Sequence, residues 1–123
     1  DFEPDLPVES RIGGNTTLAV VATNAAMGKA DAKRVAMMAH DGLARAIRPV
    51  HTPFDGDTIF ALSTARMTLP EPAEFAIARI GALAADCLSR AIGRAVFAAE
   101  PLGAMPSYRQ SYPEAFADDD HRR

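Results

Sequence analysis

The sequence has one cysteine, no tryptophan and no long apolar stretch. With Cys87 alone, no disulfide forms within the chain, and sparing use of cysteine fits a reducing compartment, so we expect a cytoplasmic location. No apolar run reaches the roughly 18 residues of a membrane span. No basic run is interleaved with aromatic residues, as it is in many nucleic-acid-binding proteins. Neither a membrane nor a nucleic acid is therefore an expected partner.

The first residues also lack a targeting signal. The start, Asp1-Phe2-Glu3-Pro4-Asp5, has neither the basic nor the apolar region of a signal peptide. Because the chain begins with Asp rather than Met, we expect a fragment or a processed subunit. A hydrophobic content of 48%, a charged content of 24% and a net charge of −3 are typical of one globular domain.

Apolar patterns along the chain predict a strand, a helix, a strand and a helix, and thus an α/β fold. The strands are 17–23, ended by Asn24, and 57–64; the helices are 29–47 and 72–99. Proline, glycine and acidic residues in the flanks predict a linker at 1–15, a core at 16–100 and an irregular tail at 101–123 with a disordered end. The apolar face of the first helix comprises Val35, Met38, Ala39, Gly42, Leu43, Ala46 and Ile47.

These elements are too few to bury their own apolar surface. The first strand is apolar and β-branched, as in strands buried on both faces. Two strands and two helices cannot cover both faces, and a two-stranded sheet is marginal alone. We therefore expect another chain to complete a larger sheet. The second helix, also expected to be covered on more than one side, has a narrow polar stripe formed by Arg79, Asp86, Arg90 and Arg94.

A glycine turn before a hydroxyl residue makes Thr16 a candidate nucleophile. In Gly13-Gly14-Asn15-Thr16, the Thr16 hydroxyl can attack the Asn15 carbonyl and form an ester that water opens. The α-amine freed on Thr16 would titrate near pH 8, which suits a general base. Asn15–Thr16 is then a processing site. The same residues also suit a plain glycine turn before a buried strand.

The segment Asp55-Gly56-Asp57 offers a pair of carboxylates. Residues at i and i+2 of an extended segment point to the same side of the chain. Two carboxylates at such a short distance raise one another's pKa, so one of them can hold a proton and relay it. A polar turn entering a strand has the same pattern. Hard cations need more oxygen ligands than this loop supplies, so we expect neither a metal nor another cofactor.

Other reactive side chains fit structural roles. His51, four residues before Asp55, is either part of a charge network or a solvated loop residue, and His40 is expected to pack inside the first helix. Ser63, His51 and Asp55 make a formal triad, but no Gly-x-Ser-x-Gly elbow is present. Cys87 is expected in the core. The remaining residues of this kind are His121, in the tail, and Met37 and Met38, expected as core filler.

Three blocks resemble a known family. They are GNTTLAVVATN at 14–24, KRVAMMAHDGLARAI at 33–47 and DGDTIFALST at 55–64. In this order they resemble the C-terminal, β-subunit part of the DmpA-type aminopeptidases, which include L-aminopeptidase/D-esterases, β-peptidyl aminopeptidases and nylon-oligomer (6-aminohexanoate-oligomer) endohydrolases. The likeness covers roughly residues 13–100. Thr16 together with Asp55 and Asp57 is most similar to the nylon-oligomer branch, since many other members have serine at the nucleophile.

The resemblance implies a precursor that cleaves itself into a long α-chain and a short β-chain. The two would form a four-layer αββα sandwich, like that of N-terminal nucleophile hydrolases, to which this chain supplies about two strands and two helices. Thr16 would be the new N-terminus and nucleophile, with Asp57 near it and Asp55 beside Asp57. The implied partners are the α-chain, further α/β pairs in a homo-oligomer, and a small amide or peptide substrate. Oxyanion and pocket residues would lie largely in the α-chain.

Three hypotheses follow. The first is an autoprocessing amide-bond hydrolase that uses Thr16, Asp55 and Asp57. The second is a non-catalytic structural or binding subunit of the same fold. The third is an acyltransferase of the ornithine-acetyltransferase type, which would transfer acyl groups to an amine in preference to water.

Overall fold

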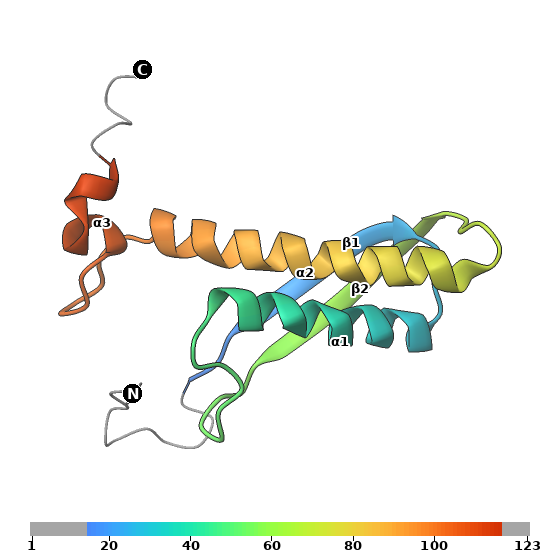
Figure 1. Cartoon of the computed structure of the whole chain (residues 1–123), viewed down its shortest axis with the longest axis horizontal. Helices are drawn as coiled ribbons and strands as arrows, with labels where there is room; N and C mark the ends of the chain where they lie inside the picture. Colours follow the sequence, from blue (N-terminus) through green and yellow to red (C-terminus); the bar gives the residue numbers. More distant parts are fainter. Residues whose placement is uncertain (1–14, 117–123) are drawn as a thin grey trace. The chain divides into compact units, whose positions relative to one another are not determined.

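The computed structural model describes residues 15–116, which form an α/β arrangement of two parallel strands and two long helices (Figure 1). The predicted order of elements is confirmed, with ends shifted by a few residues. Most of the expected linker at 1–15 and the last residues of the tail, 117–123, lie outside the described residues. The elements are β1 (Leu18–Ala25), α1 (Lys29–Ala46), β2 (Thr58–Met67), α2 (Ala73–Ala98), α3 (Tyr108–Ser111) and a 3₁₀ helix, η1 (Pro113–Phe116).

The first strand does not end at Asn24 as expected. The register is regular up to Thr23 opposite Ser63, and then shifts so that Ala25 pairs with Met67. The Ser63 hydroxyl donates to the Ala25 carbonyl across the shift. The side-chain hydrogen bond therefore carries β1 through an irregularity that apolar periodicity does not reveal.

The strand pair has one covered face and one open face. On the covered face, where α1 packs on β2, Ile59 is buried. Because side chains alternate along a strand, the intervening residues point the other way. Those on the open face that are large, apolar and more than half exposed are Leu18, Val20, Phe60 and Leu62. We expected the strands to be buried on both faces, but within the described chain only one face of the strand pair is covered.

The apolar face predicted for α1 is confirmed at its centre. Val35, Ala39, Gly42 and Leu43 are buried, and Val35 and Leu43 are the largest fully buried side chains. The helix ends where the Ile47 N–H donates to the Leu43 carbonyl. Ala46, also predicted for this face, is exposed at the end of the helix. Periodicity at i+3 and i+4 therefore identified the part of the core that α1 supplies.

Two glycines bring α1 and α2 close together, and the helices lie side by side in Figure 1. A Cβ built on Gly42 would lie within van der Waals overlap of the Ala85 carbonyl, and one built on Gly81 would overlap the Met38 side chain. Arg45 pairs with an aspartate of the α2 polar stripe, but the pair is largely exposed and contributes little stability. Of the helices formed by residues 15–116, none has the length and apolar character needed to cross a membrane.

The close contact at Gly42 predicts opposite effects of the same substitution at two helix positions. Gly42→Ala pushes a methyl group against the α2 backbone, so the free energy of unfolding falls by about 1–3 kcal/mol. For Gly93→Ala, the added Cβ has no described atom within 4 Å beyond its chain neighbours and the backbone of its own helix turn, so the free energy rises by roughly 0.5–1 kcal/mol through helix propensity. Urea unfolding of both variants measures the difference. Equal stability of the two variants would contradict the packing at Gly42.

The segment after α2 is more regular than the expected irregular tail. The chain divides into two compact units, Asp1–Ser89 and Arg90–Arg123, and in the second unit α3 begins with a capping box between Ser107 and Gln110. Phe116 stacks on Phe97, with ring centroids 4.1 Å apart, and the Arg109 guanidinium lies over the Phe116 ring. The cap and the ring cluster give residues 107–116 local order.

Candidate active site

The predicted cleavage junction and the predicted acid pair lie at the same edge of the sheet. β1 and β2 are parallel, and Leu18 faces Thr58 at their starts. The segments just before the strands, 15–17 and 55–57, therefore lie side by side. Sequence patterns gave each segment separately, and the strand pairing brings them together.

Backbone hydrogen bonds hold the Asn15–Thr16 bond in this position. Asn15 N–H donates to the Phe54 carbonyl at 3.4 Å, and Gly56 N–H donates to the Asn15 carbonyl at 2.8 Å. A Cβ built on Gly56 would lie 2.7 Å from the Thr16 hydroxyl oxygen. Both the carbonyl and the hydroxyl of the junction thus face Gly56.

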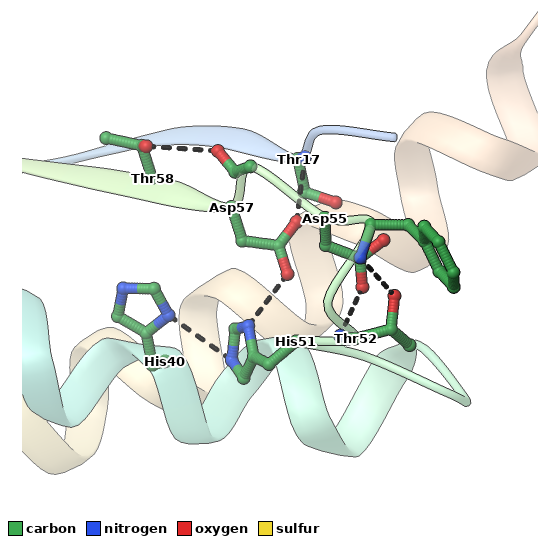
Figure 2. Close-up of polar contacts among 9 residues, drawn as sticks. Thr17, His40, His51, Thr52, Asp55, Asp57 and Thr58 are labelled. Carbon is green, nitrogen blue, oxygen red and sulfur yellow. Dashed lines mark hydrogen bonds and ion pairs between the residues drawn. The ribbon is translucent and has the colours of Figure 1, made fainter. Parts of the chain in front are cut away.

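Asp57 is the buried carboxylate of the site, with 5% of its side chain exposed. Its Oδ1 accepts a hydrogen bond from Thr17 N–H at 2.9 Å, and its Oδ2 lies 2.7 Å from His51 Nδ1 (Figure 2). Burial raises the pKa of Asp57, but the Thr17 hydrogen bonds and the His51 contact outweigh burial and hold the pKa below its ordinary value of 3.8. Asp57 is therefore a carboxylate at neutral pH.

Asp57 contacts His51, and His51 in turn contacts His40. Figure 2 shows His51 between Asp57 and His40, and His51 Nε2 lies 3.3 Å from His40 Nδ1. His51 has a positive φ of 57°, which the loop after α1 imposes. The expected charge network thus exists, but the partner of His51 is Asp57 instead of Asp55. His40, expected only to pack, is half-buried beside the site, and no spacing in the sequence signals this contact.

Asp55 closes the loop that carries His51. Its Oδ2 accepts from Thr52 N–H at 2.7 Å, and its own N–H donates to the Thr52 carbonyl at 3.0 Å. Both aspartates turn toward this loop in Figure 2, yet they bind different groups. The expectation that the two carboxylates raise one another's pKa is wrong for Asp57, because its own hydrogen bonds dominate.

A cavity of about 240 Å³ opens beside the junction. Reactive and polar groups form one part of its wall, and apolar side chains from the end of α1 and the following loop form the other. The exposed residue Thr16 and a neighbouring apolar wall suit the binding of an amide with an aliphatic part. The lining residues are Asn15, Thr16, Thr17, Ile47, Pro49, Val50, Thr52, Phe54, Asp55 and Asp57.

The other candidate nucleophiles lie away from this cavity. Ser63 donates its hydroxyl to the Ala25 carbonyl in the sheet, so it forms no triad with His51. Cys87, expected in the core, is exposed on α2, and Met37, expected as core filler, is also exposed. Both predictions are wrong for the described chain because each residue lies on a helix face that packs against no described element.

Comparison with known proteins places this chain in a family. Residues 3–108 match peptidase family S58. The chain belongs to peptidase family S58. This membership confirms the resemblance to DmpA-type aminopeptidases that the three sequence blocks indicated. The junction and the acid pair both fall within the matched residues.

Several relatives of this chain carry names that indicate hydrolysis of peptide or amide bonds. An uncharacterized aminopeptidase of Mycobacterium tuberculosis is 46% identical over 111 residues, which cover 83% of this chain and 32% of the relative. A 6-aminohexanoate-oligomer endohydrolase of Kocuria sp. is 38% identical over 69 residues, covering 56% of this chain and 19% of the relative. A 6-aminohexanoate-oligomer endohydrolase of Agromyces sp. is 40% identical over 57 residues, which cover 46% of this chain and 16% of the relative. The chain thus spans about a third or less of their lengths.

The pKa of Asp57 predicts a pH-dependent contribution to stability. Because the pKa is lower in the folded chain than in the unfolded chain, ionised Asp57 stabilises the fold above the ordinary value of 3.8, and this stabilisation is lost as pH falls through the folded pKa. Asp57→Asn keeps an oxygen for Thr17 N–H but removes the charge. We expect the variant to be less stable than the wild type at about pH 7 and the difference to shrink toward about pH 3. Urea midpoints across this range measure it, and a constant difference would contradict the assignment.

Proposed function

We propose that this chain is the catalytic part of an autoprocessing amide-bond hydrolase with Thr16 as its N-terminal nucleophile. The observation that carries the proposal is the pairing of segments 15–17 and 55–57, which holds the Asn15–Thr16 bond against Gly56 and beside Asp57 at the mouth of a cavity. Membership of peptidase family S58 supports the reaction class.

Self-cleavage would begin with attack of the Thr16 hydroxyl oxygen on the Asn15 carbonyl carbon. The hydroxyl proton passes to the Thr16 nitrogen, the C–N bond breaks, and an ester joins the Asn15 acyl group to the Thr16 oxygen. One water molecule then hydrolyses the ester, which leaves a carboxylate on Asn15 and a free hydroxyl and α-amine on Thr16. No other reactant is needed.

Substrate hydrolysis would repeat this chemistry on a substrate amide. The freed α-amine takes the proton of the Thr16 hydroxyl as the oxygen attacks the substrate carbonyl, and returns it to the leaving amine, so that the acyl group remains as an ester on Thr16. One water molecule then hydrolyses the ester, which releases the acid and restores the Thr16 hydroxyl. Asp57, ionised and bound to Thr17, would hold the N-terminus in place and stabilise positive charge on the amine. Asp55 would act beside it by fixing the loop that carries His51.

The substrate class we propose is amide oligomers or peptides. The names of the aminopeptidase and endohydrolase relatives support this class, and the apolar wall of Ile47, Val50 and Phe54 suits an aliphatic segment. The names of the relatives and the apolar wall are compatible with an endohydrolase and with an aminopeptidase.

A second polypeptide segment would complete the fold. We propose that the α-part of the same precursor covers the open sheet face, giving a four-layer αββα sandwich, and that such pairs assemble into a homo-oligomer. The exposed Leu18, Val20, Phe60 and Leu62 support a missing layer, because soluble proteins seldom leave a contiguous apolar patch open.

The intact mass of the purified complete protein tests the proposal. A fragment that begins at Thr16, appearing over time with a complementary fragment that ends at Asn15, is the expected result. A stable, uncleaved polypeptide that hydrolyses no amide would contradict it and favour a binding subunit.

A further inference from the structure

Gly56 contacts both reacting groups of the Asn15–Thr16 junction. Its N–H donates to the Asn15 carbonyl oxygen at 2.8 Å, and its α-carbon leaves a space in which a Cβ would lie only 2.7 Å from the Thr16 hydroxyl oxygen. The next nearest Thr16 atoms would be 3.7 Å from that Cβ, an ordinary contact distance. The crowding is therefore with the hydroxyl itself.

The backbone conformation does not explain why position 56 is a glycine. Gly103, in the second unit, has a positive φ of 58°, which side chains rarely adopt, but the φ of Gly56 lies outside this left-handed region. An alanine could take the same backbone angles at position 56. The methyl group of that alanine, however, would not fit beside the Thr16 hydroxyl.

We propose that Gly56 serves self-cleavage in two ways: its N–H stabilises the oxyanion, and its missing side chain sets the position of the attacking hydroxyl. This inference rests on the proposed self-cleavage. When the Thr16 oxygen bonds to the Asn15 carbon, the carbonyl π electrons move onto the carbonyl oxygen, and the Gly56 N–H already points at that oxygen within the range of an oxyanion donor. The charge disappears when the C–N bond breaks.

Gly56→Ala in the complete protein tests the steric half of this role. The added methyl group displaces the Thr16 hydroxyl from its place, and a displacement of about 1 Å can slow a positioned reaction about 10²-fold. We expect the half-time of conversion to the Thr16 fragment, followed by intact mass, to lengthen by about that factor. Gly93→Ala adds the same methyl group where it meets no described atom within 4 Å beyond its chain neighbours and its own helix backbone, and should cleave at the wild-type rate.

A double-mutant cycle with Thr16→Ala separates the contact between the added methyl group and the Thr16 hydroxyl from a general disturbance of the turn. Without the hydroxyl, the methyl group of Gly56→Ala meets nothing closer than an ordinary contact, so Gly56→Ala should lower the Tm in the presence of Thr16 and leave it unchanged in the Thr16→Ala background. An equal fall in both backgrounds would overturn the inference, since the damage would then not involve the hydroxyl.

The outcomes also separate this inference from the proposed function. If Thr16→Ala blocks cleavage while Gly56→Ala cleaves as fast as the wild type, the role of Gly56 is wrong and the nucleophile stands. If Thr16→Ala still splits before residue 16, the proposed self-cleavage is wrong, and the role of Gly56 falls with it.

Discussion

We expect Thr16→Ala to abolish self-cleavage and to lower kcat/KM for amide hydrolysis by at least about 10⁴-fold, because it removes the hydroxyl proposed to attack both carbonyls. Thr16→Ser keeps the attacking oxygen and the α-amine and should retain both reactions. Thr68→Ala, at an exposed position just after β2, removes a threonine of no proposed role and serves as the matched control. Intact mass and initial rates on a short amide oligomer give the two readouts.

Residual activity would be informative only if its source were known. A Thr16→Ala protein that stays uncleaved yet hydrolyses the oligomer at the wild-type rate would show that another group attacks the substrate. That result would contradict the N-terminal nucleophile mechanism, even though the fold and the family membership would stand.

The second largest loss is expected from Asp57. Asp57→Asn preserves the size of the side chain and an acceptor for Thr17 N–H, but it removes the charge that faces His51, so kcat should fall by about 10²–10³-fold. Asp55→Asn keeps an acceptor for Thr52 N–H, and because Asp55 acts through the loop, its loss should be smaller. Steady-state kinetics on cleaved protein compares them.

Equal losses for the two variants would contradict this division of roles. They would indicate that Asp55 and Asp57 act as one unit on the reacting atoms, as a pair sharing a proton does. A change in KM alone for Asp57→Asn would instead assign Asp57 to substrate binding.

Much of the fold follows from local pattern. The face of α1 that carries Val35, Ala39 and Leu43 is visible in the sequence because a helix repeats its contacts every three to four residues. The cap of α3 was missed: Ser107 and Gln110 have capping-box spacing, but the prolines around them led us to expect an irregular tail. The exposure of Cys87 and Met37 could not be predicted, since one helix face looks as apolar as another.

The site is only partly a matter of pattern. Thr16 and Asp57 stood out as residue types, but their approach depends on the parallel register of two strands separated by a helix. The contact of His40 with His51 depends on the path of the loop after α1, which local periodicity does not encode. The short distance between Gly56 and the Thr16 hydroxyl can be seen only in the structure, because an Asp-Gly-Asp segment is equally typical of a plain turn.

The most direct test of Thr16 as nucleophile is to trap the acyl group in the cleaved protein. A slow ester or amide substrate is added, the reaction is quenched in acid, and the acyl mass is located by peptide mapping. The expected result is an acyl group on the hydroxyl of the peptide that begins at Thr16. An acyl group on Ser63 or Cys87, or hydrolysis with no acylated Thr16 at any time, would contradict the mechanism.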